Sequence, residues 1–482
     1  MSTTDLTAIL PLLVVAAASV VVMLQAAWGE ERSAGAGWTI LGLAVALATL
    51  PLASAVSPRQ VTPLLGLDRY ALFYLGLILA AGLAVAALSD GYLARRGLAQ
   101  GEFHVLLLLA ILGSAALVAS SHFASFFLGL ELLSVSLYAL IAYPRPDRRS
   151  LEAGVKYLVL AGASSAFLLF GMALTYAETG TMEFARIGSV LGSGKLTSGY
   201  MLTGLGLMLT GVGFKLAVVP FHMWTPDVYE GAPAPVTAFV ATVSKGAMFA
   251  LLLRYFAQTN AYGYGALTLA LGGIAVASML AGNLLALMQD NVKRILAYSS
   301  IAHLGYLLVA FLAAGQTAAE AVTFYLVAYF VTMVGAFGVI TVLSTGDRDA
   351  DRMEDYRSLF WRRPGVACTF TAMLLSLAGI PLTAGFVGKF LVLSAGVGSA
   401  LWILVFVLVV GSAIGLFYYL RIVVAMFAPT AGEGVEAVSP SVAALTPVSG
   451  LVLAVLTLLL LWFGVYPAPL IRMIQLAVGS LT

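Results

Sequence analysis

Five ionisable residues lie within long apolar segments, and their types point to proton transfer. Four are lysines (Lys156, Lys215, Lys245 and Lys389), and the fifth is Glu131 in FFLGLELLSVSLYAL. An ionisable group at the centre of a bilayer costs at least about 2.5 kcal/mol, so it indicates a functional site with a partner. Arginine stays protonated in proteins, whereas a desolvated lysine can lose its proton at physiological pH. The pattern therefore favours a proton relay.

Some of these lysines have a second interpretation. Lys156 lies near the start of its apolar segment, so its ammonium can extend to the membrane surface. For Lys215 and Lys389 the alternative is a structural ion pair. However, Glu131 is the only acid near the middle of an apolar segment. At least some of the deep lysines must then be neutral part of the time, as a relay requires.

Lys215 and Lys389 also stand beside helix breakers. Lys215 is followed by Pro220 in GVGFKLAVVPFHMW, and Lys389 is preceded by Pro381 in LAGIPLTAGFVGKF. Proline removes a backbone donor and clashes with the preceding helical turn. Both segments therefore predict broken membrane helices, which are typical of a transport site when they occur in corresponding positions.

Two histidines are further candidates. His303 lies deep in the segment SSIAHLGYLLVAF, and its imidazole titrates nearest neutral pH, so it is predicted to join the relay. The alternative is a neutral imidazole that is hydrogen-bonded to a hydroxyl group or water. His222 follows Pro220 at the first break, where it is predicted either to line an entrance or to cap the broken backbone. The four scattered histidines predict no metal site.

The composition requires a membrane environment. Of the 482 residues, 61% are hydrophobic and 10% are charged, whereas soluble domains have about 45–50% and 25%. This excludes a soluble globular or disordered chain. The net charge of +2 indicates no nucleic-acid partner. The single cysteine, Cys368, excludes an internal disulfide and a site built from several thiolates, so no cofactor is expected in this chain.

Apolar windows of about 20 residues predict an all-α polytopic membrane protein with about fourteen spans. The fourth and fifth spans are separated by three polar residues only, at 120–122. The two broken spans are the seventh and the twelfth, so two inverted five-helix repeats are expected. The predicted units are 1–101 with three helices, 102–258 and 259–429 with one repeat each, and 430–482 with the last helix.

Basic residues outside the spans predict the orientation. Connections after odd-numbered spans hold fourteen Lys and Arg, among them Lys293, and the other connections and the C-terminus hold six, among them Arg254. Because basic residues gather in cytoplasmic connections, both termini are predicted on the outer side. The charged stretch 346–364 is the longest cytoplasmic connection, and we expect a solvated loop there rather than a docking surface.

Three motifs resemble the antiporter-like subunits of the proton-pumping NADH:quinone oxidoreductase, respiratory complex I, and most of all its N type. The most specific is FHMWTPDVYEGAPAPVTAFVATVSKGAMFALLLR, and SIAHLGY and LAGIPLTAGFVGKF add independent matches. Lys389 stands where M-type subunits carry glutamate. The sequence after the fourteenth span also lacks the long lateral helix of L-type subunits.

The resemblance implies a role for each candidate residue. Glu131 is the acid of the fifth span, and Lys215 is its partner in the broken seventh. Lys156 lies between the cytoplasmic side and this pair, Lys245 connects the two half-channels, and Lys389 leads towards the exit. Proton movement is driven by quinone reduction in other subunits and is communicated through a chain of buried charges.

The resemblance also implies that FMN, iron–sulfur clusters, NADH and quinone bind to other subunits. The expected partners are the M-type subunit and small K-, J- and A-type subunits, in a bacterial inner membrane. Two other classes remain open. The first is a cation/proton antiporter subunit of related fold. The second is a structural scaffold whose buried charges only specify helix packing.

Overall fold

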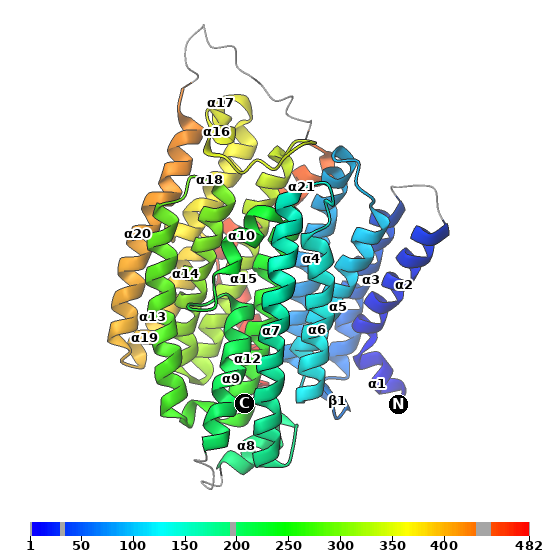
Figure 1. The fold of residues 1–482 in the computed structure, drawn as a ribbon, viewed down its shortest axis with the longest axis vertical. Helices are drawn as coiled ribbons and strands as arrows, with labels where there is room; N and C mark the ends of the chain where they lie inside the picture. The colour runs from blue at the N-terminus through cyan, green and yellow to red at the C-terminus, as the bar shows by residue number, and fades with distance from the viewer. Residues whose placement is uncertain (1, 29–33, 193–198, 430–444, 482) are drawn as a thin grey trace.

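The protein is a bundle of helices that run side by side along the long axis of the molecule (Figure 1). The structure is a computed structural model that describes residues 2–28, 34–192, 199–429 and 445–481. Twelve of the described helices are long and apolar enough to cross a membrane. Two further spans are each divided into two helices, which brings the described spans to the fourteen predicted.

The elements up to the first break are α1 (Thr3–Ala8), α2 (Leu10–Trp28), α3 (Ala34–Ala55), β1 (Arg59–Thr62), β2 (Leu65–Leu67), α4 (Arg69–Arg95), α5 (Gly101–Ala119), α6 (Phe123–Ile141), α7 (Arg148–Thr179), α8 (Phe184–Gly192) and α9 (Gly199–Leu216). Strands β1 and β2 form an antiparallel hairpin. The elements that follow the break are α10 (Trp224–Gly231), α11 (Ala234–Phe239), η1 (Val240–Ser244), α12 (Lys245–Thr259), η2 (Ala261–Gly263), α13 (Gly265–Leu287), α14 (Val292–Ala313), α15 (Gly315–Leu343), α16 (Met353–Tyr356), α17 (Leu359–Arg362), α18 (Pro364–Ala378), α19 (Ala384–Gly398), α20 (Trp402–Phe427), α21 (Pro447–Val465) and α22 (Ala468–Val478).

Both predicted helix breaks are present. The chain between α9 and α10 is not helical around Pro220, and the chain between α18 and α19 is not helical around Pro381. The last carbonyls of a helix have no partner within it. Each break therefore ends a helix inside the bundle, close to a lysine. The sequence analysis missed α22, because its 11 residues are too few for a spanning window of about 20.

The helices α5 and α6 are separate, as the three polar residues between them predict. The side chain of His122 caps α6 by accepting a hydrogen bond from the backbone N–H of Ala124 at 3.0 Å. The two helices approach closely at Gly113, where an added Cβ would lie 2.6 Å from the backbone nitrogen of Leu133 and 2.8 Å from the carbonyl oxygen of Gly129. Small residues permit such close packing of membrane helices.

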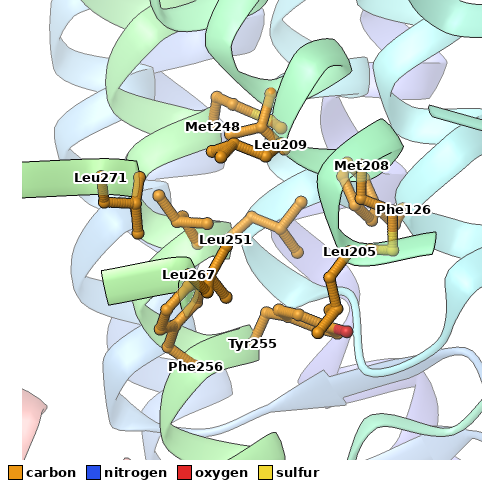
Figure 2. A pocket seen from close by; sticks show the side chains of 12 residues that line it. Phe126, Leu205, Met208, Leu209, Met248, Leu251, Tyr255, Phe256, Leu267 and Leu271 are labelled. Atoms are coloured by element: carbon orange, nitrogen blue, oxygen red, sulfur yellow. The ribbon is translucent and has the colours of Figure 1, made fainter. Parts of the chain in front are cut away.

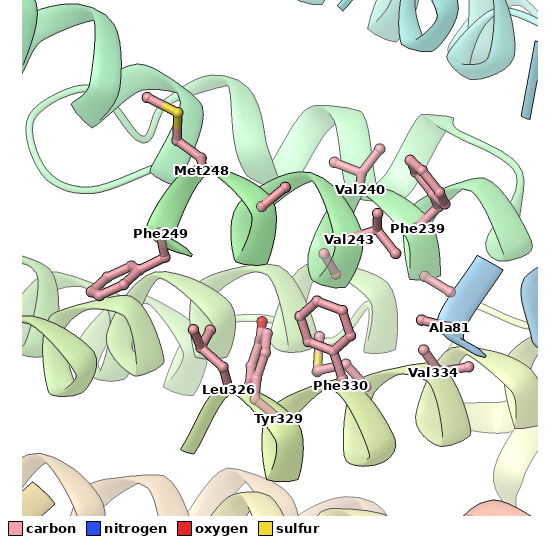
Figure 3. Packing of buried hydrophobic residues seen from close by; sticks show 14 of the residues in the cluster. Ala81, Phe239, Val240, Val243, Met248, Phe249, Leu326, Tyr329, Phe330 and Val334 are labelled. Atoms are coloured by element: carbon pink, nitrogen blue, oxygen red, sulfur yellow. The ribbon is translucent and has the colours of Figure 1, made fainter. Parts of the chain in front are cut away.

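The centre of the bundle is formed by α15 and by the continuous segment from α11 to α12. An 18-residue apolar stretch of each span is completely buried. Figure 3 shows this segment beside α15, with Phe330 and Val334 of α15 pointing toward it. The π-helical turn η1 lies in this segment directly before Lys245, and such turns occur often at functional sites.

Both ends of the described chain lie at one end of the bundle, as the even number of spans predicts. The guanidinium Nε of Arg59 lies 2.7 Å from a carboxylate oxygen of Asp5, and the backbone N–H of Tyr70 donates to Ser480 Oγ at 3.1 Å. Arg59 begins the hairpin and Tyr70 lies in the first turn of α4, so both residues lie at the same end of the bundle. The short helices α16 and α17 lie at the opposite end (Figure 1).

The close approach of α5 and α6 yields a stability prediction. We expect Gly113→Ala to lower stability by about 1–3 kcal/mol, because the neighbouring atoms belong to the backbone and cannot move aside. The matched control is Gly206→Ala in α9, where an added Cβ meets nothing within 4 Å. The measurement is thermal denaturation of the purified complex, in which the folded fraction of this chain is recorded as the temperature rises. Equal midpoints for the two variants would contradict this account.

Candidate functional site

Lys215 lies in the last turn of α9, immediately before the first break. Its side chain is buried, with 3% of the residue exposed. The ammonium donates to Ser134 Oγ at 3.1 Å and to the hydroxyl of Tyr157 at 3.0 Å. Both partners are neutral hydroxyl groups, and they accept hydrogen bonds from an ammonium that the apolar surroundings disfavour.

Glu131 lies one turn before Ser134 on α6, and it is half-buried. Its Oε1 accepts a hydrogen bond from Ser165 Oγ at 2.5 Å. In the described part of the chain, no ion pair within 4.0 Å joins Glu131 to Lys215. Ser134 lies between the two groups, and their partnership stays a prediction.

Lys245 occupies the first position of α12 in the centre of the bundle, with 1% of the residue exposed. Its ammonium donates to Ser300 Oγ on α14 at 2.7 Å. The same hydroxyl oxygen lies 2.7 Å from the hydroxyl of Tyr329 and 3.2 Å from that of Tyr229. The ring of Trp224 lies 6.0 Å from the ammonium. Ser300 is thus the point where three helices present polar groups to Lys245.

His303 lies one turn after Ser300 on α14, with 3% of the residue exposed. Its Nδ1 shares a hydrogen bond of 2.7 Å with the hydroxyl of Tyr325, and its Nε2 lies 3.2 Å from the hydroxyl of Tyr419. The ring of Tyr329 lies 5.6 Å from the imidazole. Both alternatives for His303 therefore have support, because it is hydrogen-bonded to tyrosines and also borders the polar group around Lys245.

Lys389 lies on α19, just after the second break, with 7% of the residue exposed. Its ammonium donates to the carbonyl oxygen of Ala378, the last residue of α18, at 2.9 Å and to Ser412 Oγ at 2.8 Å. Gly379 makes room for it, because an added Cβ there would lie 2.8 Å from the lysine Cδ, and its φ of +84° also favours glycine. The second broken helix thus presents the C-terminal end of α18 to a lysine.

Lys215, Lys245, His303 and Lys389 form a line through the bundle. The ring of Tyr306 lies 5.3 Å from both the imidazole of His303 and the ammonium of Lys389. At the other end of the line, the rings of Tyr157 and Trp224 lie 4.9 Å apart between Lys215 and Lys245. The structure therefore brings the predicted Lys215, Lys245, His303 and Lys389 into one sequence of polar and aromatic contacts.

The sequence analysis missed the residues that connect this line. They are serine and tyrosine side chains on membrane helices: Ser134, Tyr157, Tyr229, Ser300, Tyr306, Tyr325, Tyr329, Ser412 and Tyr419. The sequence carries a usable signal for Ser300 alone among them. Ser300 precedes His303 by three residues, and residues three apart share a helix face. The others come from helices distant in sequence.

The ammonium of Lys156 lies at the surface of the described chain. The side chain is 42% exposed and its Nζ lies 2.7 Å from both Glu152 and Asp227. These residues line a polar cavity of about 190 Å³ together with Arg149 and Glu230. This exposure agrees with the interpretation that the side chain extends to the membrane surface, and its role in the relay stays a prediction.

Two residues assigned to connections are instead buried in helices. Arg254 of α12 is 2% exposed and forms two hydrogen bonds of 2.8 Å with the carboxylate of Asp68. Lys293 of α14 has no exposed side-chain area and lies 2.7 Å from Asp349. The assignment failed because each cation is paired with an acid from a distant segment, which compensates its burial.

The prediction of a solvated loop at 346–364 is also wrong in its first part. Asp349 accepts hydrogen bonds from Tyr92 and Arg96 at 2.8 Å and from Lys293 at 2.7 Å. Asp351 accepts a hydrogen bond of 2.7 Å from Asn291. Burial by itself raises the pKa of a carboxyl group, but the nearby Lys293 and Arg96 outweigh it and hold the pKa of Asp349 below its usual value. The connection is therefore docked on the ends of α4 and α14.

Two further features bear little on the line. His222 is 8% exposed in the first break, and its Nδ1 has no hydrogen-bond partner within the described chain.

An apolar cavity of about 30 Å³ lies between α9, α12 and α13, and Figure 2 shows Leu205, Met248 and Leu267 pointing into it. Its lining offers too few polar groups to hold water or a proton carrier. No cluster of metal-ligating side chains occurs among the described residues.

The fold and the buried lysines define a class of polytopic membrane protein with two broken helices. A sequence profile of the family described as "NADH:quinone oxidoreductase/Mrp antiporter, TM" matches residues 120–415. A chain in the structure of respiratory complex I from Thermus thermophilus with bound aureothin is 33% identical, with a TM-score of 0.81 and coverage of 96% of this chain and 98% of that one. A chain of the Mrp complex from Dietzia sp. DQ12-45-1b is 21% identical, with a TM-score of 0.85 and coverage of 100% and 98%, and supports the fold alone.

Curated relatives narrow the class. NADH-quinone oxidoreductase subunit N of Nitrosospira multiformis is 56% identical over 99% of this chain and 97% of its own length. The subunit N of Methylococcus capsulatus is 50% identical over 98% and 95%. This chain therefore belongs to the subunit N family of NADH-quinone oxidoreductases, and it is a multi-pass membrane subunit of that antiporter-like class.

The docked connection yields a prediction with a defined pH dependence. Because the pKa of Asp349 is held below the ordinary value of 3.8, its contribution to docking is complete above that value and is lost as the pH falls through the lowered pKa. We expect equal protection of residues 344–352 at pH 7 and pH 5, and faster exchange at both in Asp349→Asn. Hydrogen–deuterium exchange measures this.

The control is Asp347→Asn, which changes an exposed acid of the same connection. It should leave the exchange unchanged. Equal protection in the Asp349→Asn variant and the unmodified chain would show that the carboxylate does not hold the connection.

Proposed function

We propose that this chain translocates protons across the membrane as the N-type subunit of an NADH:quinone oxidoreductase. The protons pass along Lys215, Lys245, His303 and Lys389, and movement is coupled to quinone reduction in other subunits. The observation that carries the proposal is the line of contacts from Lys245 through Ser300 to His303. It places titratable groups next to hydroxyl groups in the centre of an otherwise apolar bundle.

Glu131 gates the first lysine in this proposal. At an effective dielectric constant of about 20, unit charges about 4 Å apart attract each other by roughly 4 kcal/mol. A small movement of Glu131 towards Lys215 therefore stabilises the ammonium, and its withdrawal leaves a desolvated charge that releases its proton. The separate hydrogen bonds of the two groups, to Ser165 and Ser134, give each group a partner when the two are apart.

Lys156 belongs to the entrance of the path. Its ammonium borders the polar cavity at the start of α7, and the ion pair with Asp227 connects it to α10. Lys156 borders the cavity, and the next residue in α7, Tyr157, contacts Lys215. Neighbouring residues of one helix therefore contact the cavity and the first buried lysine. A role for His222 at this entrance stays a prediction.

We propose a bacterial inner membrane with both termini on the outer side. The membrane partners are an M-type subunit and small K-, J- and A-type subunits. FMN, iron–sulfur clusters, NADH and quinone bind elsewhere in the complex. Purification distinguishes this assembly from a cation/proton antiporter of the same fold, because a subunit of the oxidoreductase co-elutes with flavin and iron–sulfur absorbance. The names of the relatives favour the oxidoreductase.

Lys215→Arg tests the relay role. Arginine keeps the positive charge but cannot release its proton, so we expect NADH-driven proton pumping in inverted membrane vesicles to fall by about tenfold or more. Arg59→Lys is the control, because it exchanges basic residues at a partly exposed site far from the line. Full pumping by an assembled Lys215→Arg complex would rule out the relay and favour a scaffold.

Ser300→Ala tests the connection between Lys245 and His303. A hydrogen bond to a charged group contributes about 1.5–3 kcal/mol, so its loss should slow proton transfer by about tenfold or more. The matched control is Ser89→Ala, since the buried Ser89 hydroxyl donates only to the carbonyl of Val85 in its own helix. The same vesicle assay compares the two. Similar small losses in both variants would place the proton path elsewhere.

A further inference from the structure

Lys293 holds the end of the broken helix α10. It lies in the first turn of α14 and has no exposed side-chain area. Its ammonium donates to the carbonyl oxygens of Glu230 and Ala232 at 2.9 and 2.7 Å. These carbonyls lie at the C-terminal end of α10, where no intrahelical partner is available. A buried cation at this position satisfies them and interacts favourably with the helix end.

Asp349 supplies the charge that makes this burial tolerable. Its Oδ2 accepts the third hydrogen bond of Lys293, and its Oδ1 accepts from Tyr92 and Arg96. Tyr92 belongs to α4 and Arg96 follows that helix directly. The carboxylate therefore ties α10, α14 and α4 together at one end of the bundle.

The next residue of α14 holds the side chains of the same helix. The guanidinium of Arg294 lies 3.0 Å from Asp227 and 2.9 Å from Glu230, both on α10. Consecutive residues at the start of α14 thus contact both the terminal carbonyls and the acidic face of α10. This leaves the short helix little freedom to move relative to α14.

The position of α10 matters for Lys245. The ring of Tyr229 lies 5.2 Å from its ammonium, and the Tyr229 hydroxyl lies 3.2 Å from Ser300, the hydrogen-bond partner of Lys245. Trp224, at the other end of α10, lies between Lys245 and Tyr157. The contacts of the central lysine therefore depend on where α10 is held.

We propose that Lys293 and Asp349 form a positioning pair, the α10 clamp, which holds Tyr229 and Trp224 against Lys245 and Ser300. The clamp lies outside the line of titrating groups and acts through α10 on the geometry of that line. This inference rests on the proposed function, because it assumes that Lys245 carries protons.

The test uses the assembled complex in inverted membrane vesicles. Lys293→Met and Asp349→Asn should each lower NADH-driven proton pumping by about tenfold or more, since a small misplacement of reacting groups has effects of this size. Lys293→Arg, which keeps the charge and donors, should recover part of the loss. Asp347→Asn, an exposed acid of the same connection, is the control and should pump normally. Oxidation of NADH by an artificial electron acceptor normalises for the amount of complex.

A double variant separates positioning from general destabilisation. If the clamp acts through Tyr229, then adding Tyr229→Phe to Lys293→Met should cause little further loss, because the contact is already broken. Losses that multiply would overturn the clamp. If Lys293→Met prevents assembly, Asp349→Asn with Tyr229→Phe provides the same comparison, because asparagine keeps the size of the side chain.

The outcomes also distinguish the clamp from the proposed function. If Lys215→Arg abolishes pumping while Lys293→Met and Asp349→Asn pump fully, the clamp fails and the proton line stands. If Lys215→Arg pumps fully, the proposed function fails whatever the clamp variants do.

Discussion

The structure depends on the cost of placing an ammonium group in an apolar bundle. Lys245 meets this cost with a hydrogen bond to Ser300 and with aromatic rings around it, and its neighbours on the line rely on similar partners. None of these deep lysines forms an ion pair with an acid among the described residues. A neutral hydroxyl or carbonyl oxygen holds the ammonium less strongly than a carboxylate would, because hydrogen bonds between two charged groups are stronger. Such partners leave a lysine free to exchange its proton.

The two broken helices serve the same requirement by different routes. Lys215 lies within the last turn of α9, whereas Lys389 comes from the second half of its broken span and reaches back to the end of α18. The carbonyl of Ala378 takes the place of an acidic partner for Lys389, and hydroxyl groups do so for Lys215. Pro381 prevents α18 from continuing and so leaves its last carbonyls without helical partners.

Charges that do form full ion pairs lie away from the line. Arg254 with Asp68 and Lys293 with Asp349 are buried pairs, and removing one partner of such a pair leaves an uncompensated charge. Both pairs connect helices that are distant in sequence. The bundle thus contains two kinds of buried cation: those with neutral partners, which suit proton transfer, and those with acidic partners, which hold helices in place.

The sequence by itself determined the membrane spans, the two breaks and the lysines, because a long apolar window and a proline beside a lysine are local signals. It also indicated the family through contiguous motifs. The tertiary structure alone decided which cations are relay candidates. The sequence placed Lys293 in a connection and Lys156 within a span, and the structure pairs them with Asp349 and Asp227, which lie 56 and 71 residues away. Hydrogen-bond partners of buried groups come from other helices, and no pattern within one helix specifies which neighbour it meets.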